Sequence, residues 1–357
     1  MILGIDASRS VSTIKKTGVE LVSDELLKTI SNQQSASSKQ TIVYYTPQRI
    51  DWLPVENQRI LRWPFKFFWT QIRLAWELIS HPPEKMFFPV HAMPLLLITS
   101  YKLRVTSYFH IIHDIAFKKQ PHLYSFRQKL ILNLDLFLAR KLCTKIFVPT
   151  EAVRQDLIQY TKINPKKIIV TPWGYKSINN KQKTANNKKK QILYIGRVEK
   201  KKNIENLIKG FEIFHATHPD YKLILAGKID RRLKIYDLGF KNIEALGYIN
   251  EKKKYELLRE SATLLLVSKE EGFGFPLLEA FDFDLPVIAS DIPVLREIGE
   301  DACFYADPDS PEDISDKLKK VITDEKLQAQ LITAGQERLK QFDWQKTAEQ
   351  ILSEITG

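Results

Sequence analysis

The chain has 357 residues, of which 44% are hydrophobic and 27% are charged, a composition typical of a globular protein with more than one core. It holds only two cysteines, Cys143 and Cys303, which excludes a disulfide-rich secreted fold. The net charge of +12 predicts acidic partners, such as nucleotide phosphates or anionic lipid headgroups. No zinc-finger spacing or RNA-binding motif is present, so we expect no nucleic-acid partner.

The first residues, MILGIDAS, have neither the basic flank nor the long apolar run of a signal peptide. No stretch reaches the roughly 18 apolar residues that span a membrane. We therefore expect a cytoplasmic protein.

The first half of the chain alternates apolar runs with helical patterns. The runs at residues 2–6, 42–45, 85–88, 108–112, 145–148 and 167–170 are predicted strands. Helical periodicity is present at residues 19–30, 125–142 and 151–160. Such alternation indicates a parallel sheet covered by helices on both faces.

A polar stretch separates this half from a second alternating series. Residues 176–190 contain almost no apolar side chains and are predicted to form a linker. Apolar runs follow at 191–196, 221–226, 262–267 and 286–290, each with a helical pattern after it. The sequence therefore predicts an α/β protein with two parallel-sheet domains.

Residues 59–78 of the first half combine basic and aromatic side chains. Arg59, Arg62, Lys66 and Arg73 alternate with six tryptophans and phenylalanines. This mixture is typical of a segment that lies on an anionic membrane surface. The alternative is that Pro64 divides a short strand from a helix that faces the core.

The segment EGFGFPLLE, from Glu271 to Glu279, follows the buried strand predicted at 262–267. Gly272 and Gly274 allow a turn in which main-chain amides can approach a ligand closely. Pro276 suits the first turn of a helix, where its missing N–H is not needed. A strand, a glycine turn and a helix N-terminus together predict an anion site with a carboxylate on each side.

The run QILYIGRVEKKKN, from Gln191 to Asn203, predicts the other half of this site. Its strand ends at Gly196, and Asn203 is a predicted N-cap for the helical pattern that follows. Ligands of parallel sheets bind at the carboxyl ends of strands, where Arg197 and Lys202 are expected. These two cations could neutralise a diphosphate without a metal.

The spacing of Glu271 and Glu279 resembles the E-x7-E motif of the family 4 glycosyltransferases, which are retaining enzymes of the GT-B fold. The resemblance covers nearly the whole chain. It implies two Rossmann-like domains that face a central cleft. Residues 1–173 would bind the acceptor, residues 174–342 would bind the nucleotide-sugar donor, and a C-terminal helix at 343–357 would return to the first domain.

The resemblance also implies roles for residues of the second domain. Arg197 and Lys202 would stabilise the leaving diphosphate. Glu279 would hold the ribose, and Glu271 would reach the donor sugar. The turn that contacts sugar and diphosphate would comprise Gly272, Phe273, Gly274, Phe275, Leu277 and Leu278.

Further positions follow from the same resemblance. His113 matches a histidine that contacts the donor sugar, and His91 and Asp114 would line the acceptor side. Gly18 would bring amides toward the diphosphate. Gly247, at a strand end, would let the main chain approach the base, although an ordinary strand-end glycine explains it equally well.

Asp282 and Asp284 spell the DxD pattern of metal-dependent glycosyltransferases. They follow the Glu279 helix, where the family has a glycine at position 284, so we interpret them as a helix end. No zinc-type spacing of His and Cys is present either. We expect no metal and no cofactor besides the donor.

The predicted function is retaining transfer of a hexose, such as mannose or glucose, from a nucleoside diphosphate to a hydroxyl of a glycan or a lipid-linked acceptor. Synthesis of cell-surface polysaccharide or glycolipid is the expected setting, on the inner face of the cell membrane. Two alternatives stay open. One is a GT-B sugar-nucleotide epimerase or hydrolase, and the other is a non-catalytic sugar-nucleotide-binding protein.

Overall fold

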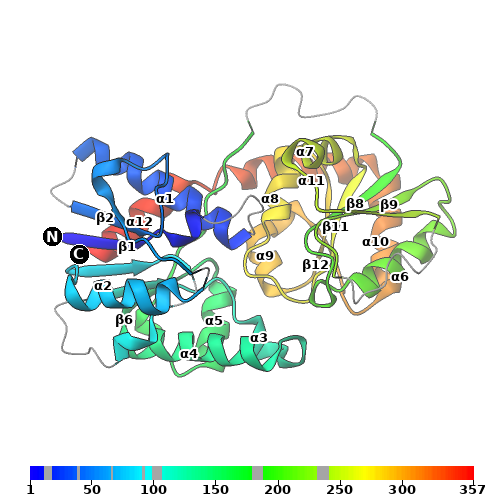
Figure 1. The fold of residues 1–357 in the computed structure, drawn as a ribbon. Helices are drawn as coiled ribbons and strands as arrows, with labels where there is room; N and C mark the ends of the chain where they lie inside the picture. Colours follow the sequence, from blue (N-terminus) through cyan, green and yellow to red (C-terminus); the bar gives the residue numbers. More distant parts are fainter. Residues whose placement is uncertain are drawn as a thin grey trace. The chain divides into compact units, whose positions relative to one another are not determined.

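The computed structural model describes residues 1–11, 18–37, 41–65, 67–90, 93–98, 107–178, 188–230 and 241–357. The chain forms two compact units, coloured in sequence order in Figure 1. Unit 1 comprises Met1–Gly174 together with Asp343–Gly357, and unit 2 comprises Tyr175–Phe342.

Unit 1 is built on a parallel sheet with the strand order β3-β2-β1-β4-β5-β6-β7. Its strands are β1 (Ile2–Asp6), β2 (Thr41–Thr46), β3 (Gln58–Ile60), β4 (Lys85–Phe88), β5 (Ser107–Ile111), β6 (Cys143–Val148) and β7 (Ile168–Val170). The short edge strand β3 was not among the predicted strands, because its three residues are mostly exposed and carry no apolar run.

Helices cover the sheet of unit 1. They are α1 (Gly18–Ser37), the π-helix η3 (Trp69–Leu74), α2 (Ala75–Ser80), α3 (Ala116–Lys119), α4 (Phe126–Leu142), α5 (Glu151–Tyr160) and α12 (Trp344–Thr356). Short 3₁₀ turns are η1 (Ser8–Ser10), η2 (Val55–Asn57), η4 (Leu95–Ile98), η5 (Pro121–Leu123) and η6 (Pro165–Lys167). The C-terminal helix α12 packs against α1, and Lys85 Nζ donates to the Ile355 carbonyl at 2.6 Å.

Unit 2 has a second parallel sheet, with the order β10-β9-β8-β11-β12-β13. Its strands are β8 (Gln191–Ile195), β9 (Lys222–Ala226), β10 (Ile243–Gly247), β11 (Thr263–Leu266), β12 (Val287–Ser290) and β13 (Phe304–Ala306). Its helices are η7 (Lys200–Lys202), α6 (Ile204–His215), α7 (Glu251–Glu260), α8 (Phe275–Asp282), α9 (Pro293–Gly299), η10 (Glu300–Ala302), α10 (Pro311–Thr323) and α11 (Glu325–Leu339).

The predicted α/β class with two parallel sheets is confirmed. The division between the units falls after Gly174. Strands β8, β11 and β12 are buried throughout, as expected for strands with helices on both sides. Both cysteines are buried, and burial raises the pKa of each thiol, so neither is a reactive thiolate. None of the described helices is long and apolar enough to cross a membrane.

Candidate functional site

The central strands β8 and β11 of unit 2 are neighbours, although two other strands separate them in sequence. From β8 the chain continues outward to β9 and β10, and β11 then starts the other half of the sheet. Such a reversal of strand order leaves a crevice at the carboxyl edge, where open parallel sheets bind ligands. Residues 196–203 follow β8 at this edge, and residues 267–274 follow β11.

Two glycines bring the ends of β8 and β9 into close contact. Gly227 has φ +147°, and a Cβ there would lie 1.8 Å from the Gly196 carbonyl oxygen. Tyr194 Oη donates to the Arg197 carbonyl at 2.9 Å, which fixes the main chain just beyond the strand. The turn that carries Arg197 is therefore held by packing and hydrogen bonds.

Asn203 occupies the position before α6, but the prediction that its side chain caps this helix is wrong. The residue is left-handed, with φ 58°, and its side chain makes no capping hydrogen bond. Its buried Nδ2 instead donates to the carbonyls of Val267 at 2.9 Å and Pro308 at 2.6 Å. Asn203 thus ties the loop after β8 to the end of β11.

The N-terminus of α8 offers unpaired amides at the end of β11. Gly274 precedes the helix with φ +102°, a conformation that favours glycine, and Pro276 lies in the first turn. Within the described part of the chain, the N–H groups of Gly272, Phe273, Gly274 and Phe275 have no acceptor. Several such N–H groups and the helix dipole form the anion site that the sequence predicts.

Three of the predicted turn residues have buried side chains, which a ligand does not reach. The side chains of Leu277 and Leu278 are fully buried, and Phe273 is nearly so. The Leu277 N–H already donates to the Gly274 carbonyl at 2.9 Å. The turn therefore offers a ligand its main-chain groups, mainly those before Leu277, and the partly exposed Phe275 side chain.

The structure brings Lys202 and Glu271 together. Lys202 Nζ lies 2.7 Å from Glu271 Oε1, and the two side chains are only 17% and 13% exposed. The neighbouring Lys201 instead pairs with Glu199 at 3.3 Å. Arg197 Nη2 lies 3.5 Å from the same Glu199, and its side chain is 56% exposed. Of these cations, Lys202 is the one in contact with the predicted sugar-binding carboxylate.

Glu279 has a partner that sequence reasoning missed. Lys254 Nζ, on α7, lies 2.6 Å from Glu279 Oε1, with both side chains about four-fifths buried. Burial lowers the pKa of Lys254, but the adjacent Glu279 carboxylate outweighs it, and the net shift is upward. Lys254 ends a run of three lysines on a helix, and no local pattern distinguishes it from its neighbours.

Gly247 ends β10 with φ +70°, and its carbonyl accepts from Gly227 N–H at 2.8 Å. No atom lies within 4 Å of the place where a Cβ would stand. The glycine is therefore required by its conformation rather than by crowding. Its predicted contact with the base stays a prediction.

The predicted residues of unit 1 have well-defined local environments. His113 is buried, with Nε2 3.3 Å from the Pro89 carbonyl and its ring 5.6 Å from that of Trp173. Asp114 Oδ1 accepts from the Ala116 N–H at 3.0 Å and so begins α3.

Gly18 is the exposed first residue of α1, and a Cβ there would meet nothing within 4 Å. His91 lies outside the described residues. The roles predicted for these unit 1 residues stay predictions.

Comparison with known protein families finds a match for the second unit. The model of the family described as glycosyl transferases group 1 matches residues 176–338. The match lies entirely within unit 2.

Curated proteins that are similar to this chain include O-antigen mannosyltransferases. The chain is 30% identical to the O-antigen chain mannosyltransferase B of Escherichia coli over 45% of this chain and 44% of the relative. It is 26% identical to the O-antigen chain mannosyltransferase RfbU of Salmonella typhimurium over 74% and 71%, respectively. The chain spans less than half the length of the first of these relatives.

Solved structures share the fold of the whole chain. Anabaena Alr3699/HepE in complex with UDP and glucose has a TM-score of 0.74 at 16% identity, covering 99% of each chain. WaaG, a glycosyltransferase involved in lipopolysaccharide biosynthesis, has a TM-score of 0.71 at 16% identity, covering 100% of each chain. These neighbours confirm the GT-B fold prediction.

Asp282 and Asp284 lie at the end of α8, the helix that carries Glu279, as interpreted from the sequence. Asp282 is the buried last residue of α8 and accepts from Ser177 Oγ at 2.5 Å and Ile178 N–H at 2.8 Å. Asp284 is left-handed, with φ 51°, and accepts from Gln336 Nε2 at 2.6 Å. This conformation explains why a glycine suits position 284. Within the described ranges, no cluster of three or more His, Cys, Asp or Glu side chains could hold a metal.

Proposed function

We propose that the protein is a retaining glycosyltransferase that moves a hexose from a nucleoside diphosphate to a hydroxyl of a glycan or lipid-linked acceptor. The match of residues 176–338 to the glycosyl transferases group 1 model supports glycosyl transfer. The observation that carries the proposal is the 2.7 Å contact of Lys202 with Glu271, directly before the unpaired amides of α8. A cation, a carboxylate and amide donors at one strand edge suit a diphosphate and a sugar bound together.

The chemistry follows from these groups. The bond between the anomeric carbon and the phosphate oxygen breaks, and its electron pair goes to the diphosphate. The α8 amides, Lys202 and Arg197 stabilise this charge. The acceptor oxygen bonds to the anomeric carbon on the face that the phosphate leaves, and its proton passes to the departing phosphate oxygen. No side chain has to be a strong base in this scheme.

Glu279 is the proposed ribose ligand, and Lys254 is the residue that orients it. With one carboxylate oxygen 2.6 Å from the Lys254 ammonium, the other oxygen has a restricted direction in which to accept from ribose hydroxyls. The ribose is common to all nucleotide donors, so this contact supplies affinity without selecting the sugar.

The proposal also concerns the identity of the donor sugar. The relatives are named mannosyltransferases, whereas the HepE structure holds UDP and glucose. We infer a hexose donor of one of these two kinds. Thermal stabilisation by a panel of nucleoside diphosphate mannoses and glucoses would identify it, because a bound ligand raises the melting temperature by mass action.

A donor assay with and without acceptor tests the transfer itself. Transfer requires an acceptor, and NMR of the product would show the anomeric configuration of the donor. Conversion of the donor alone would favour an epimerase or hydrolase. Donor binding with no turnover under any condition would favour a binding protein.

We propose that no divalent metal takes part, because Lys202 and Arg197 supply positive charge for the diphosphate. The setting that we propose is synthesis of cell-surface polysaccharide or glycolipid. Both O-antigen relatives are named for this process, and WaaG is a glycosyltransferase involved in lipopolysaccharide biosynthesis. A lipid-linked acceptor would place the enzyme on the inner face of the cell membrane.

A further inference from the structure

One part of unit 1 concentrates exposed apolar side chains. Of the eighteen large hydrophobic side chains exposed in the described ranges, eleven lie in residues 65–76, η4 and α4. All five exposed phenylalanines are among them. We call this surface the α2–η4–α4 face. A concentration of exposed apolar side chains of this kind marks a docking site on a protein surface.

Helix α4 turns an apolar side toward solvent. Phe126, Leu130 and Phe137 are 77%, 49% and 40% exposed, and their spacing of four and seven residues places them on one side of the helix. The opposite side packs inward, where Asp135 Oδ2 lies 3.0 Å from His110 Nε2. The outward side is therefore not explained by packing of unit 1.

Hydrogen bonds join the three elements into one surface. Gln71, on η3, accepts from the Leu95 N–H at 2.9 Å and donates to the Met93 carbonyl at 3.1 Å. The Met93 N–H in turn donates to Asp135 Oδ1, on α4, at 3.1 Å. These bonds hold η3, η4 and α4 in place relative to one another.

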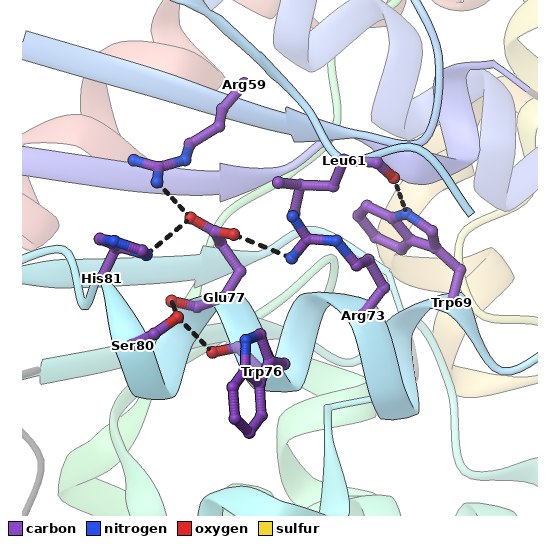
Figure 2. A network of polar contacts seen from close by, with 8 residues as sticks. All are labelled: Arg59, Leu61, Trp69, Arg73, Trp76, Glu77, Ser80 and His81. Carbon is purple, nitrogen blue, oxygen red and sulfur yellow. Dashed lines mark hydrogen bonds and ion pairs between the residues drawn. The ribbon is translucent and has the colours of Figure 1, made fainter.

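Figure 2 shows what orients α2. Arg59, Arg73 and His81 converge on the Glu77 carboxylate, whose side chain is only 4% exposed; Arg73 Nη1 lies 2.8 Å from Oε2. This cluster holds α2 against β3 while Trp76, 67% exposed, points away. Arg59 and Arg73 therefore form ion pairs with a buried carboxylate of unit 1. The prediction that they serve as cations of a membrane-facing surface is corrected by these pairs. Features of both sequence interpretations are present: a helix after Pro64 with buried side chains, and exposed aromatic side chains beside it.

The charge of the face is one-sided. In residues 61–80, 93–98 and 126–142, the only carboxylates are Glu77 and Asp135, and both are buried and paired. Arg62, Arg127 and Lys141 are exposed. The face is therefore apolar with a positive rim and no exposed carboxylate.

We propose that the α2–η4–α4 face docks on an anionic lipid surface. Aromatic and leucine side chains enter the boundary between headgroups and acyl chains, and the rim cations meet the anionic headgroups. A second copy fits poorly, because a two-fold dimer would place the same positive face against itself. The inference deepens the proposed function by naming where a lipid-linked acceptor is met, and it rests on that function only for this purpose.

Sedimentation of the full chain with vesicles tests the inference. We expect binding to phosphatidylcholine vesicles that contain phosphatidylglycerol and much weaker binding to phosphatidylcholine alone. Phe126→Gln with Leu130→Gln should weaken binding at least about tenfold, and Arg127→Glu with Lys141→Glu by a similar factor at low salt. The matched apolar control is Ile213→Gln, at an exposed site of unit 2.

The outcomes are distinct. Equal binding to both kinds of vesicle, no binding, or unchanged binding of the α4 variants would overturn the inference. So would a doubled mass in light scattering that the Phe126→Gln, Leu130→Gln variant abolishes, because the face would then pair two copies. Affinity for a free nucleoside diphosphate should be the same in all these variants, so failure of the donor site is detected separately.

Discussion

Replacing Lys254 by methionine would test the arrangement around Glu279 most directly. Methionine keeps the length and apolar stem of lysine but removes the ammonium 2.6 Å from Glu279 Oε1. A hydrogen bond to a charged group contributes about 1.5–3 kcal/mol. Because the two side chains are about one-fifth exposed, we take the lower part of this range. Nucleoside diphosphate affinity should fall about 10- to 30-fold.

Isothermal titration of UDP and GDP would measure this change. The matched control is Lys253→Met, one residue earlier. The Lys253 side chain is 48% exposed, and its ammonium lies 3.4 Å from Glu256 Oε2. That control should bind both nucleotides as the parent does. Lys254→Arg should recover part of the affinity, since it restores the charge. In a double-mutant cycle, Lys254→Met should cost little once Glu279→Ala is present.

The reasoning would be refuted by parental affinity in Lys254→Met, or by an equal loss in Lys253→Met. A full additive loss in the cycle would also refute it, because Lys254 would then contribute without Glu279. Melting temperatures separate binding from folding: loss of about 1.5–2 kcal/mol should lower the melting temperature by about 3–8 °C in a unit of this size.

Arg197→Ala and Lys202→Ala should each lower turnover roughly 10²–10³-fold while the melting temperature changes little, and parental turnover in both would contradict the leaving-group role. EDTA should leave the rate nearly unchanged, and Asp282→Asn with Asp284→Asn should keep its turnover per folded molecule; rescue of an EDTA-inactivated enzyme by manganese would show the opposite. Lys188 has its pKa lowered to about 8, chiefly by burial, so the unfolded chain binds more protons between about pH 8 and 10.5. Stability from this group is therefore lacking below pH 8 and rises through that window, and in chemical denaturation Lys188→Met should remove the rise.

The elements around the anion site could be predicted from local sequence. The apolar run at 262–267, the glycines and Pro276 fix a strand, a turn and a helix start within a few residues. The same holds for β8 and Arg197. These features depend on backbone preferences of neighbouring residues, so one stretch of sequence contains the information.

Other features depend on residues that are distant in sequence. The sequence predicts Asn203 as an N-cap. In the fold its side chain lies within reach of the carbonyls of Val267 and Pro308, and hydrogen bonds to them replace the capping bond. Lys254 meets Glu279 only because α7 and α8 lie together in the fold. The outward apolar side of α4 looks like a core side in sequence, because periodicity does not tell which side faces the sheet.

The contact between Lys202 and Glu271 has a consequence for selectivity. A lone anion that drew the Lys202 ammonium away would leave Glu271, 13% exposed, without its counter-charge. An unpaired carboxylate with so little water around it is unfavourable in free energy. This cost would lower the affinity for bare phosphate or diphosphate. A ligand whose sugar hydroxyls donate to Glu271 while its phosphate takes Lys202 avoids this loss. The Lys202–Glu271 pair would thus favour ligands that carry both a phosphate and a sugar over ligands that carry only one of these groups.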